Sequence, residues 1–331
     1  MHDYRAPAWL RGGAWGAHVQ TIWPALASRR FEGPAPAWQR ERWATPDGDF
    51  VDADWQDPPG ASPETPLLVL FHGLEGSSAS HYAQAAAFTA GQRGWRIVVP
   101  HFRGCSGEPN RAARAYHSGD HEEIAWMLAQ CRVRQPAAPM FALGISLGGN
   151  ALLRWAQEHG KQAGEVVRAV AAVSAPLDLA ASGHAIGRGA NRLLYTPMFL
   201  RTMQRKARLT LKRHPGLFDR DRMLAARTLH AFDDVYTAPL HGFRDADDYW
   251  RRASAAPHLN ALQVPSLVVN ARNDPFVPAD SLPDPDALRA NTHLTLWQPA
   301  HGGHVGFATG APPGHVLSLP RAVMDWMQRH L

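Results

Sequence analysis

Cysteine is scarce in this sequence, which contains only Cys105 and Cys131 among its 331 residues. Two thiols cannot form a disulfide framework, and such sparse use is typical of proteins in a reducing cytoplasm. No stretch approaches the ~20 consecutive apolar residues that a membrane-spanning helix needs, and the N-terminal residues do not have the apolar region of a signal peptide. We therefore expect a cytoplasmic protein.

The common cofactor and metal motifs are also missing. The sequence contains no Walker motif, no GxGxxG after a predicted strand, no paired cysteine spacing and no HExxH. Histidines and acids are dense at 117–123, but acids in the first turn of a helix explain that density without a metal. We expect neither a cofactor nor a metal ion.

No segment concentrates the positive charge, although the net charge is +5. Because the basic residues are spread along the chain, we do not expect nucleic-acid binding. The hydrophobic share of 45% and the charged share of 19% are those of a globular protein. The chain is long enough for one large α/β domain with an insertion.

Short apolar segments alternate with helical stretches along most of the chain. Two strands at 39–45 and 49–55 flank the turn Pro46-Asp47-Gly48 and predict an antiparallel hairpin at a sheet edge. Further strands are expected at 67–71, 96–102, 140–145, 168–174, 266–271 and 293–297. Because apolar strands separated by helices build parallel sheets, we predict an α/β fold with a mostly parallel central sheet covered by helices on both faces.

The alternation breaks once, between Ser174 and Val264, where the sequence has helical patterns and no strand pattern. We expect a helical lid, or cap, inserted at 175–262. The core of the domain would then consist of a first part at 1–174 and a second part at 263–331.

The strongest local motif is Gly144-Ile145-Ser146-Leu147-Gly148, between a predicted strand and a helical stretch. A nucleophile on such a sharp turn needs small residues two positions away on either side, because its strained backbone would otherwise clash. The turn exposes the Ser146 hydroxyl and directs the Leu147 amide from a helix N-terminus toward the same space. Ser146 is therefore the candidate nucleophile, and Leu147 a candidate oxyanion donor.

A second oxyanion donor is expected from the glycine-rich turn His72-Gly73-Leu74-Glu75-Gly76, which follows the strand at 67–71. Its glycines allow a backbone amide, that of Leu74, to face a developing negative charge.

A serine hydroxyl needs a base and an orienting acid, and several residues could serve. The loop after the last strand offers His301 and His304, and spacing alone does not choose between them. Asp274 follows the strand at 266–271, where the acid is expected, and Asp178 after the strand at 168–174 is the alternative. The chain order Ser146, Asp274, histidine is that of the α/β hydrolases.

An ordered set of motifs resembles the YheT-like branch of the α/β hydrolases, related to plant EMB-type proteins and mammalian abhydrolase-domain lipases. The similarity runs along almost the whole chain. The motifs are HVQTIWP at 18–24, HGLEGSS at 72–78, FRGCSGE at 102–108, YHSGD at 116–120, GISLGGN at 144–150, FDDVYTAP at 232–239, NARNDPFVP at 270–278 and GGHVGF at 302–307.

The resemblance implies Ser146 as nucleophile, Asp274 as acid and His304 as base. It also implies a helical lid between 175 and 262 and activity on acyl esters or lipids. Asn273 stands where many relatives have a second acid. We expect no membrane anchor of the kind that the mammalian relatives carry.

The predicted helix at 197–213 is basic and amphipathic. Its stripe Arg201, Arg205, Arg208 and Lys212 has no acidic residue between its members. Such a helix could make weak contact with an anionic membrane surface, or its apolar side could simply cover a pocket.

We therefore predict a serine hydrolase that cleaves short- to medium-chain acyl esters or lipids through an acyl-enzyme, with a small-molecule ester or lipid as its partner. Acyl transfer to an alcohol would use the same residues. A non-catalytic lipid-binding homologue is the alternative from another class, although such a protein would be expected to have lost one of the three residues.

Overall fold

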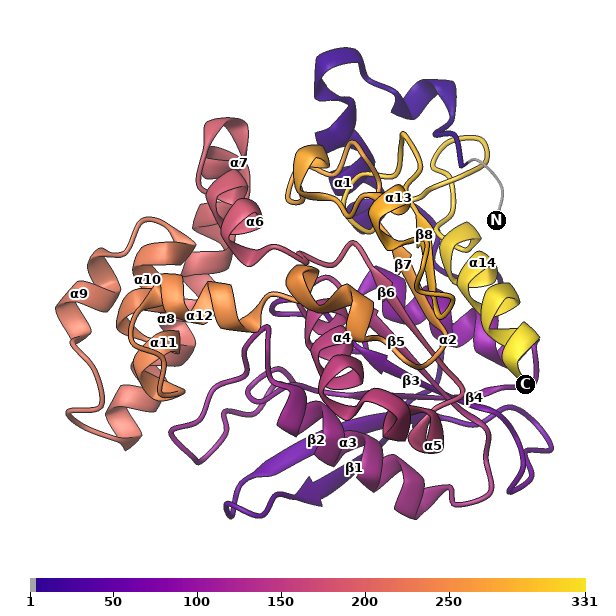
Figure 1. Cartoon of the computed structure of the whole chain (residues 1–331), viewed down its shortest axis with the longest axis horizontal. Helices are drawn as coiled ribbons and strands as arrows, with labels where there is room; N and C mark the ends of the chain where they lie inside the picture. The colour runs from indigo at the N-terminus through magenta and orange to yellow at the C-terminus, as the bar shows by residue number, and fades with distance from the viewer. Residues whose placement is uncertain (1–3) are drawn as a thin grey trace.

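The computed structural model describes residues 4–331, and an eight-stranded sheet runs through its middle (Figure 1). The strands are β1 Gln39–Ala44, β2 Phe50–Gln56, β3 Leu67–Phe71, β4 Arg96–Pro100, β5 Met140–Ile145, β6 Ala169–Val173, β7 Ser266–Val269 and β8 Leu294–Trp297. Their spatial order is β1-β2-β4-β3-β5-β6-β7-β8. β1 pairs antiparallel with β2, β2 pairs antiparallel with β4, and the other neighbours are parallel. The predicted fold class and the edge position of the hairpin are confirmed.

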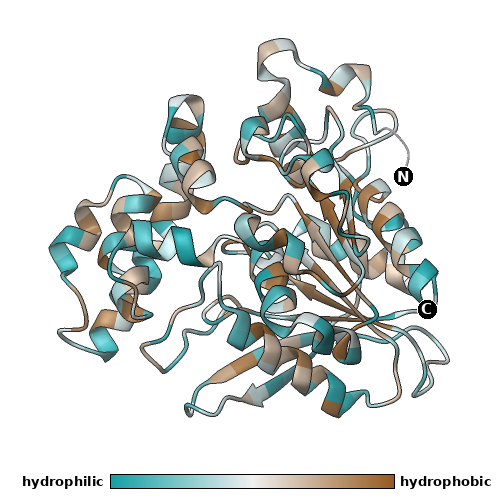
Figure 2. Ribbon diagram, viewed as in Figure 1, coloured by the Kyte–Doolittle hydropathy of each residue, from teal (hydrophilic) through white to brown (hydrophobic). Residues whose placement is uncertain are grey.

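Helices cover both faces of the sheet, because successive side chains of a strand point to opposite sides. Leu67 and Val69 of β3 pack with α3 (His121–Arg134) and α4 (Leu147–His159). Leu68 and Leu70 pack on the other side with α2 (His81–Gln92) and α14 (Ser318–Met327). Figure 2 shows the resulting apolar strands between more polar helices. The core therefore has three layers.

The chain between β6 and β7 is helical and stands to one side of the sheet (Figure 1). It has a small core of its own, which includes Leu200, Phe232 and Trp250. We call this segment, residues 175–262, the helical insertion. Its helices are α6 Leu179–Ile186, α7 Gly189–Leu194, α8 Thr196–Arg213, α9 Arg220–Ala225, α10 Leu229–Val235, α11 Thr237–Leu240 and α12 Ala246–Ala253.

Three further α-helices and several short 3-10 helices complete the fold. The α-helices are α1 Gly16–Leu26, α5 Ala163–Val166 and α13 Pro285–Leu288. The 3-10 helices are Ala8–Leu10, Gly13–Trp15, Gly160–Gln162, Ala256–Ala261, Ala279–Ser281 and Gln328–His330. Within residues 4–331, no helix combines the length and apolar character required to cross a bilayer.

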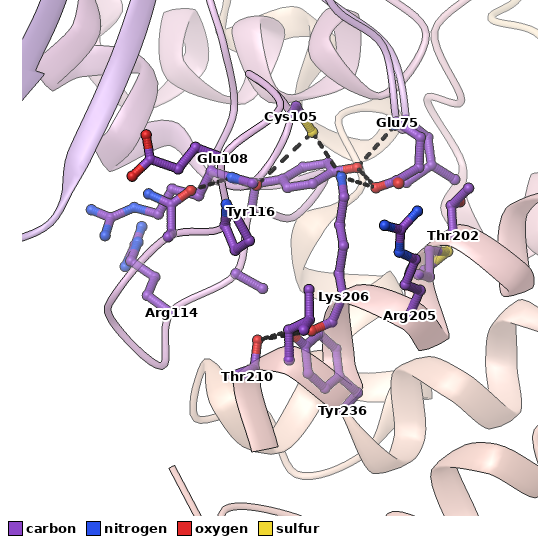
Figure 3. A pocket seen from close by; sticks show the side chains of 18 of the residues that line it. Glu75, Cys105, Glu108, Arg114, Tyr116, Thr202, Arg205, Lys206, Thr210 and Tyr236 are labelled. Atoms are coloured by element: carbon purple, nitrogen blue, oxygen red, sulfur yellow. Dashed lines mark hydrogen bonds and ion pairs between the residues drawn. The ribbon is translucent and has the colours of Figure 1, made fainter. Parts of the chain in front are cut away.

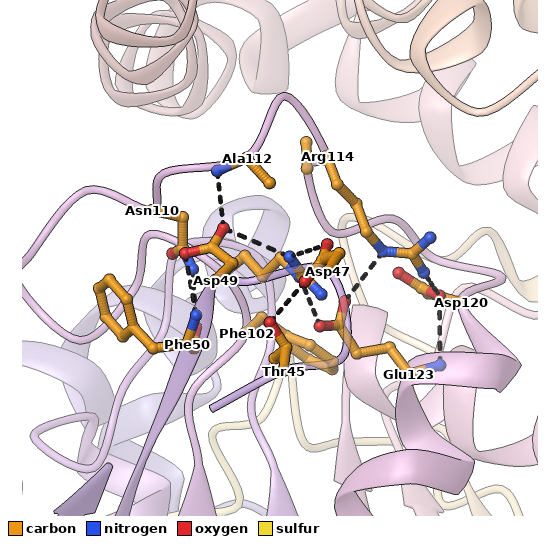
Figure 4. A network of polar contacts seen from close by, with 12 residues as sticks. Thr45, Asp47, Asp49, Phe50, Phe102, Asn110, Ala112, Arg114, Asp120 and Glu123 are labelled. Carbon is orange, nitrogen blue, oxygen red and sulfur yellow. Dashed lines mark hydrogen bonds and ion pairs between the residues drawn. The ribbon is translucent and has the colours of Figure 1, made fainter. Parts of the chain in front are cut away.

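A buried ion network fixes the loop that joins β4 to α3 (Figure 4). Arg103 donates from Nη1 to Asp47 at 2.7 Å and to Asp49 at 3.3 Å, and from Nε to Glu123 at 2.6 Å. Asp49 also accepts hydrogen bonds from two backbone amides of the loop. The hairpin turn and the start of α3 thus hold this loop in place beside the helical insertion. Removing one partner of a buried ion pair typically costs ~3–5 kcal/mol, because the other charge is left uncompensated.

Candidate active site

The turn between β5 and α4 holds Ser146 in a strained conformation, with φ 52° and ψ −120°. A non-glycine residue rarely adopts a positive φ, and such strain persists only where the surroundings enforce it. A Cβ atom at Gly144 would lie 2.5 Å from the carbonyl oxygen of Gly148. One at Gly148 would lie 2.5 Å from the carbonyl oxygens of Phe71 and His72. Both glycines are therefore required by close backbone contacts, as the motif predicts.

Ser146, His304 and Asp274 form a continuous hydrogen-bonded chain. His304 Nε2 lies 2.9 Å from Ser146 Oγ, and His304 Nδ1 lies 2.8 Å from Asp274 Oδ2. The Asp274 side chain is fully buried, and its other oxygen accepts two backbone N–H groups of the same loop. Since an ionised carboxylate can only accept, the proton lies on Nδ1 and leaves Nε2 free to accept from the serine hydroxyl. This arrangement can remove a proton from Ser146.

The two competing residues lie outside this chain. Asp178 is the N-cap of α6, and its carboxylate accepts the backbone N–H of Ala181 at 2.9 Å. The Nδ1 atom of His301 is buried and has no hydrogen-bond partner among residues 4–331. The structure thus brings Asp274 and His304 to Ser146, and it brings neither Asp178 nor His301.

Helix α1 holds the loop that carries the candidate base. The Thr21 hydroxyl accepts the backbone N–H of His304 at 2.9 Å, and Gln20 Oε1 accepts the backbone N–H two residues earlier at 2.9 Å. Gln20 also accepts from the Asn273 side chain at 3.0 Å, which ties the acid loop to the same helix. The motif HVQTIWP at 18–24 does not predict these positioning roles, because by itself it indicates only a family resemblance. The sequence offers only the adjacent polar pair Gln20-Thr21 within a largely apolar segment, and it is the structure that buries both, with Gln20 1% and Thr21 8% exposed.

The turn after β3 passes directly beside the candidate nucleophile. A Cβ atom at Gly73 would lie 3.1 Å from the Cβ of Ser146. Among residues 4–331, neither the Leu74 amide nor the Leu147 amide donates to a protein acceptor. Both amides are therefore available to a ligand next to the serine hydroxyl, which is what an oxyanion site requires.

Glu75 fixes the conformation of this turn, and sequence reasoning did not identify it. Its φ is 57°, and its backbone N–H donates to the Tyr116 hydroxyl at 2.9 Å. The same hydroxyl donates to the Glu75 carboxylate at 2.8 Å, and Lys206 Nζ of α8 donates to that carboxylate at 2.7 Å. The helical insertion is thereby connected to the turn that carries Leu74.

His72 is a buried, neutral side chain that stabilises the turn after β3. Burial lowers its pKa to about 3. Its Nε2 accepts the backbone N–H of Phe102 at 3.0 Å, so Nδ1 carries the proton and donates to the Gly73 carbonyl at 2.8 Å. His72 is therefore a structural residue.

A cavity of about 120 Å³ opens over Ser146 and His304. The helical insertion supplies most of its walls, and apolar side chains dominate. These side chains include Leu179, Ile186, Phe199, Met203, Leu229 and Trp250. Burial raises the pKa of the Asp233 carboxyl in this wall to about 6, and Thr237 and Trp250 donate to it. The cavity thus suits an apolar group.

Comparison with known proteins agrees with this geometry. A family model described as alpha/beta hydrolase fold matches residues 66–311. The chain belongs to this family. It falls in the YheT-like branch, since it is 39% identical to the putative esterase YheT of Escherichia coli K12, over 95% of this chain and 91% of that protein. It is also 28% identical to mouse phospholipase ABHD3, over 95% of this chain and 76% of that protein.

Solved structures share the fold of this α/β hydrolase. Pyrococcus horikoshii acylaminoacyl peptidase matches with a TM-score of 0.59 and 16% identity, over 90% of this chain and 42% of that one. Est1E of Butyrivibrio proteoclasticus, solved with ferulic acid, matches with a TM-score of 0.53 and 16% identity, over 88% and 98%.

Proposed function

We propose that this α/β hydrolase is a serine hydrolase that cleaves carboxylic esters, with Ser146 as nucleophile, His304 as base and Asp274 as the acid that orients it. The observation that carries the proposal is the unbroken hydrogen-bonded chain from Asp274 through His304 to a serine on a strained turn. The names esterase and phospholipase of its relatives support the same reaction type.

The proposed cycle begins when His304 accepts the Ser146 proton and Oγ attacks the ester carbonyl. The Leu74 and Leu147 amides stabilise the oxyanion, and losing one such donor typically costs ~3 kcal/mol of barrier height. The intermediate collapses, His304 protonates the departing alcohol, and an acyl-enzyme on Ser146 remains. Water then gives a proton to His304 and attacks the acyl group, and His304 returns that proton to Ser146 Oγ as the acid is released. No cofactor takes part in this cycle.

We propose the helical insertion, residues 175–262, as a lid whose apolar side covers the acyl chain of a short- to medium-chain ester or lipid. The apolar walls of the cavity over Ser146 support this, because they come mostly from the insertion. Each buried methylene contributes about 0.8 kcal/mol, so such a wall discriminates acyl chains by length.

We also propose a weak contact between α8 and anionic membrane surfaces. Arg201, Arg205, Arg208 and Lys212 are all exposed on α8, while Leu200 and Ala207 are buried beneath them. This arrangement supports an electrostatic contact of the basic face with anionic lipid headgroups.

Ester hydrolysis by the purified protein tests the proposal, with Ser146→Ala as the blank. We expect release of p-nitrophenol from p-nitrophenyl butyrate by the wild type and none above background by the variant. Added ethanol distinguishes hydrolysis from acyl transfer to an alcohol. If ethyl ester is the main product in dilute ethanol, the protein is an acyltransferase and not a hydrolase. Equal rates for both proteins would contradict the proposal.

A further inference from the structure

A second and larger cavity, of about 380 Å³, adjoins the one over Ser146 (Figure 3). It lies between α8 and the loop that joins β4 to α3. The two cavities share Leu74, Tyr116, Met203 and Thr237 as wall residues. An ester whose carbonyl oxygen faces the Leu74 amide therefore has space for one half in each cavity. The apolar cavity suits the acyl chain, which leaves the second cavity for the alcohol half.

Charged side chains line the second cavity, and both of its glutamates already have cationic partners. Glu75 accepts from Lys206 at 2.7 Å, and Glu108 accepts from Arg42 at 2.7 Å. Their negative charge is therefore balanced within the protein, so the cavity offers little attraction to a cation.

Only some of the arginines in this cavity have a carboxylate partner. Arg103 and Arg114 pair with buried acids. Arg205 and Arg213, by contrast, have no carboxylate within 4 Å among residues 4–331. Arg213 donates only to backbone carbonyls, those of Pro109 and Asn110. The cavity thus contains two guanidinium groups without an anionic partner.

Figure 3 shows the Arg205 guanidinium beside the Glu75–Lys206 pair, and Glu75 directly follows Leu74 in the chain. Lys206 is held by Glu75 and by the Cys105 thiol at 3.2 Å, so it stays in the wall. Arg205 has no such contact and is free to reach a ligand. Guanidinium groups bind phosphate and carboxylate oxygens through paired N–H donors.

We propose that this cavity binds an anionic group, of the phosphate or carboxylate class, on the alcohol half of the substrate, with Arg205 as the residue that determines this specificity. The inference rests on the proposed ester hydrolysis at Ser146. It adds that the preferred ester has an apolar acyl chain on one side of the carbonyl and a negative charge on the other.

Two esters with the same acyl group test this specificity: monobutyrylglycerol and monobutyrylglycerol phosphate. We expect the wild type to have a kcat/KM about tenfold higher for the phosphorylated ester, since a charged hydrogen-bonded pair contributes that much to binding. Arg205→Gln should bring the ratio of the two values close to one. Equal kcat/KM values in the wild type would overturn the proposal.

Arg201→Gln is the matched control, because Arg201 lies on the same helix and lines neither cavity. It should keep the wild-type preference for the phosphorylated ester. If Arg201→Gln lowers the preference as much as Arg205→Gln, a general effect of charge on α8 explains the result and the proposed site is wrong.

A binding measurement separates this inference from the proposed reaction. Glycerol phosphate should bind the full-length Ser146→Ala protein at least about tenfold more tightly than glycerol by calorimetry, and Arg205→Gln should remove the difference. If neither ester is hydrolysed, the proposed function fails while this binding result still decides the inference. Equal binding of glycerol and glycerol phosphate would overturn it. Inorganic phosphate is the second probe. If it binds as tightly as glycerol phosphate and does not compete with the neutral ester, the cavity binds a free anion and not the alcohol half of an ester. That result would also overturn the proposal.

Discussion

The ends of the sheet strands and the helical insertion contribute to the site in different ways. Ser146 follows β5 directly, and Asp274 lies in the loop after β7, where its carboxylate accepts backbone N–H groups of the same loop. The insertion supplies side chains that line cavities, such as Trp250 in the apolar wall and Arg205 in the charged one. Under the proposed function, the strand ends therefore carry the reacting groups, while the insertion selects which ester can enter.

The largest expected effects come from the loops at the strand ends. Asp274→Asn and His304→Ala should each lower kcat by about a thousandfold or more, because the base is then missing or wrongly oriented. Asp178→Asn and His301→Ala are the controls of the same residue types. Steady-state kinetics on p-nitrophenyl butyrate gives all four values. A larger loss from Asp178→Asn or His301→Ala would contradict the assignment of acid and base.

A smaller loss is expected where a residue only positions the base. Thr21→Val keeps the side-chain volume but removes the hydroxyl that accepts the His304 amide. We expect kcat to fall about tenfold with little change in KM, since a lost hydrogen bond of this kind costs about 1–1.5 kcal/mol.

Thr89→Val is the matched control for this change, because Thr89 is also a buried helical threonine but bonds only within α2. Both variants should unfold at similar urea concentrations. If Thr21→Val and Thr89→Val lower kcat equally, α1 has no special role in the placement of His304.

The insertion should control acyl chain length. The apolar wall predicts that kcat/KM rises about fourfold per methylene until the cavity is full, as 0.8 kcal/mol per methylene implies. The series p-nitrophenyl acetate, butyrate, octanoate and palmitate measures this. Ile186→Trp, which narrows the cavity, should move the optimum to shorter chains. An unchanged profile in this variant would show that the insertion does not hold the acyl chain.

The weakest expected effect is contact of α8 with lipid. Binding to anionic liposomes should fall as salt rises, because exposed charges are screened over a Debye length of about 8 Å at physiological ionic strength. Replacement of Arg205, Arg208 and Lys212 by Gln should weaken it further. Binding that is independent of salt would contradict an electrostatic contact. Helix α8 would then serve only as a wall of the two cavities.

Much of the fold was predictable because it depends on local patterns. Six apolar segments and one hairpin pattern marked all eight strands, within about two residues at each end. β4 is shorter than predicted and ends at Pro100. The reason is a tertiary contact: the Phe102 amide donates to the buried His72 ring instead of extending the ladder.

The candidate site was only partly predictable from residues alone. The turn around Ser146 is local, so its glycines and its place between strand and helix are visible in the sequence. The choice between His301 and His304 came from the family resemblance and not from spacing. Contacts such as Thr21 with His304, or Glu75 with Lys206, join distant parts of the chain. No periodicity in either segment encodes such a pair.

Covalent labelling with a fluorophosphonate tests the central claim most directly, because the reagent requires an activated serine and not a particular ester. Mass spectrometry of the labelled wild type should find one phosphonate per chain, on the peptide that contains Ser146. Ser146→Ala should stay unlabelled, and His304→Ala should label far more slowly than His301→Ala. A label on another residue, or a labelled Ser146→Ala protein, would contradict the account.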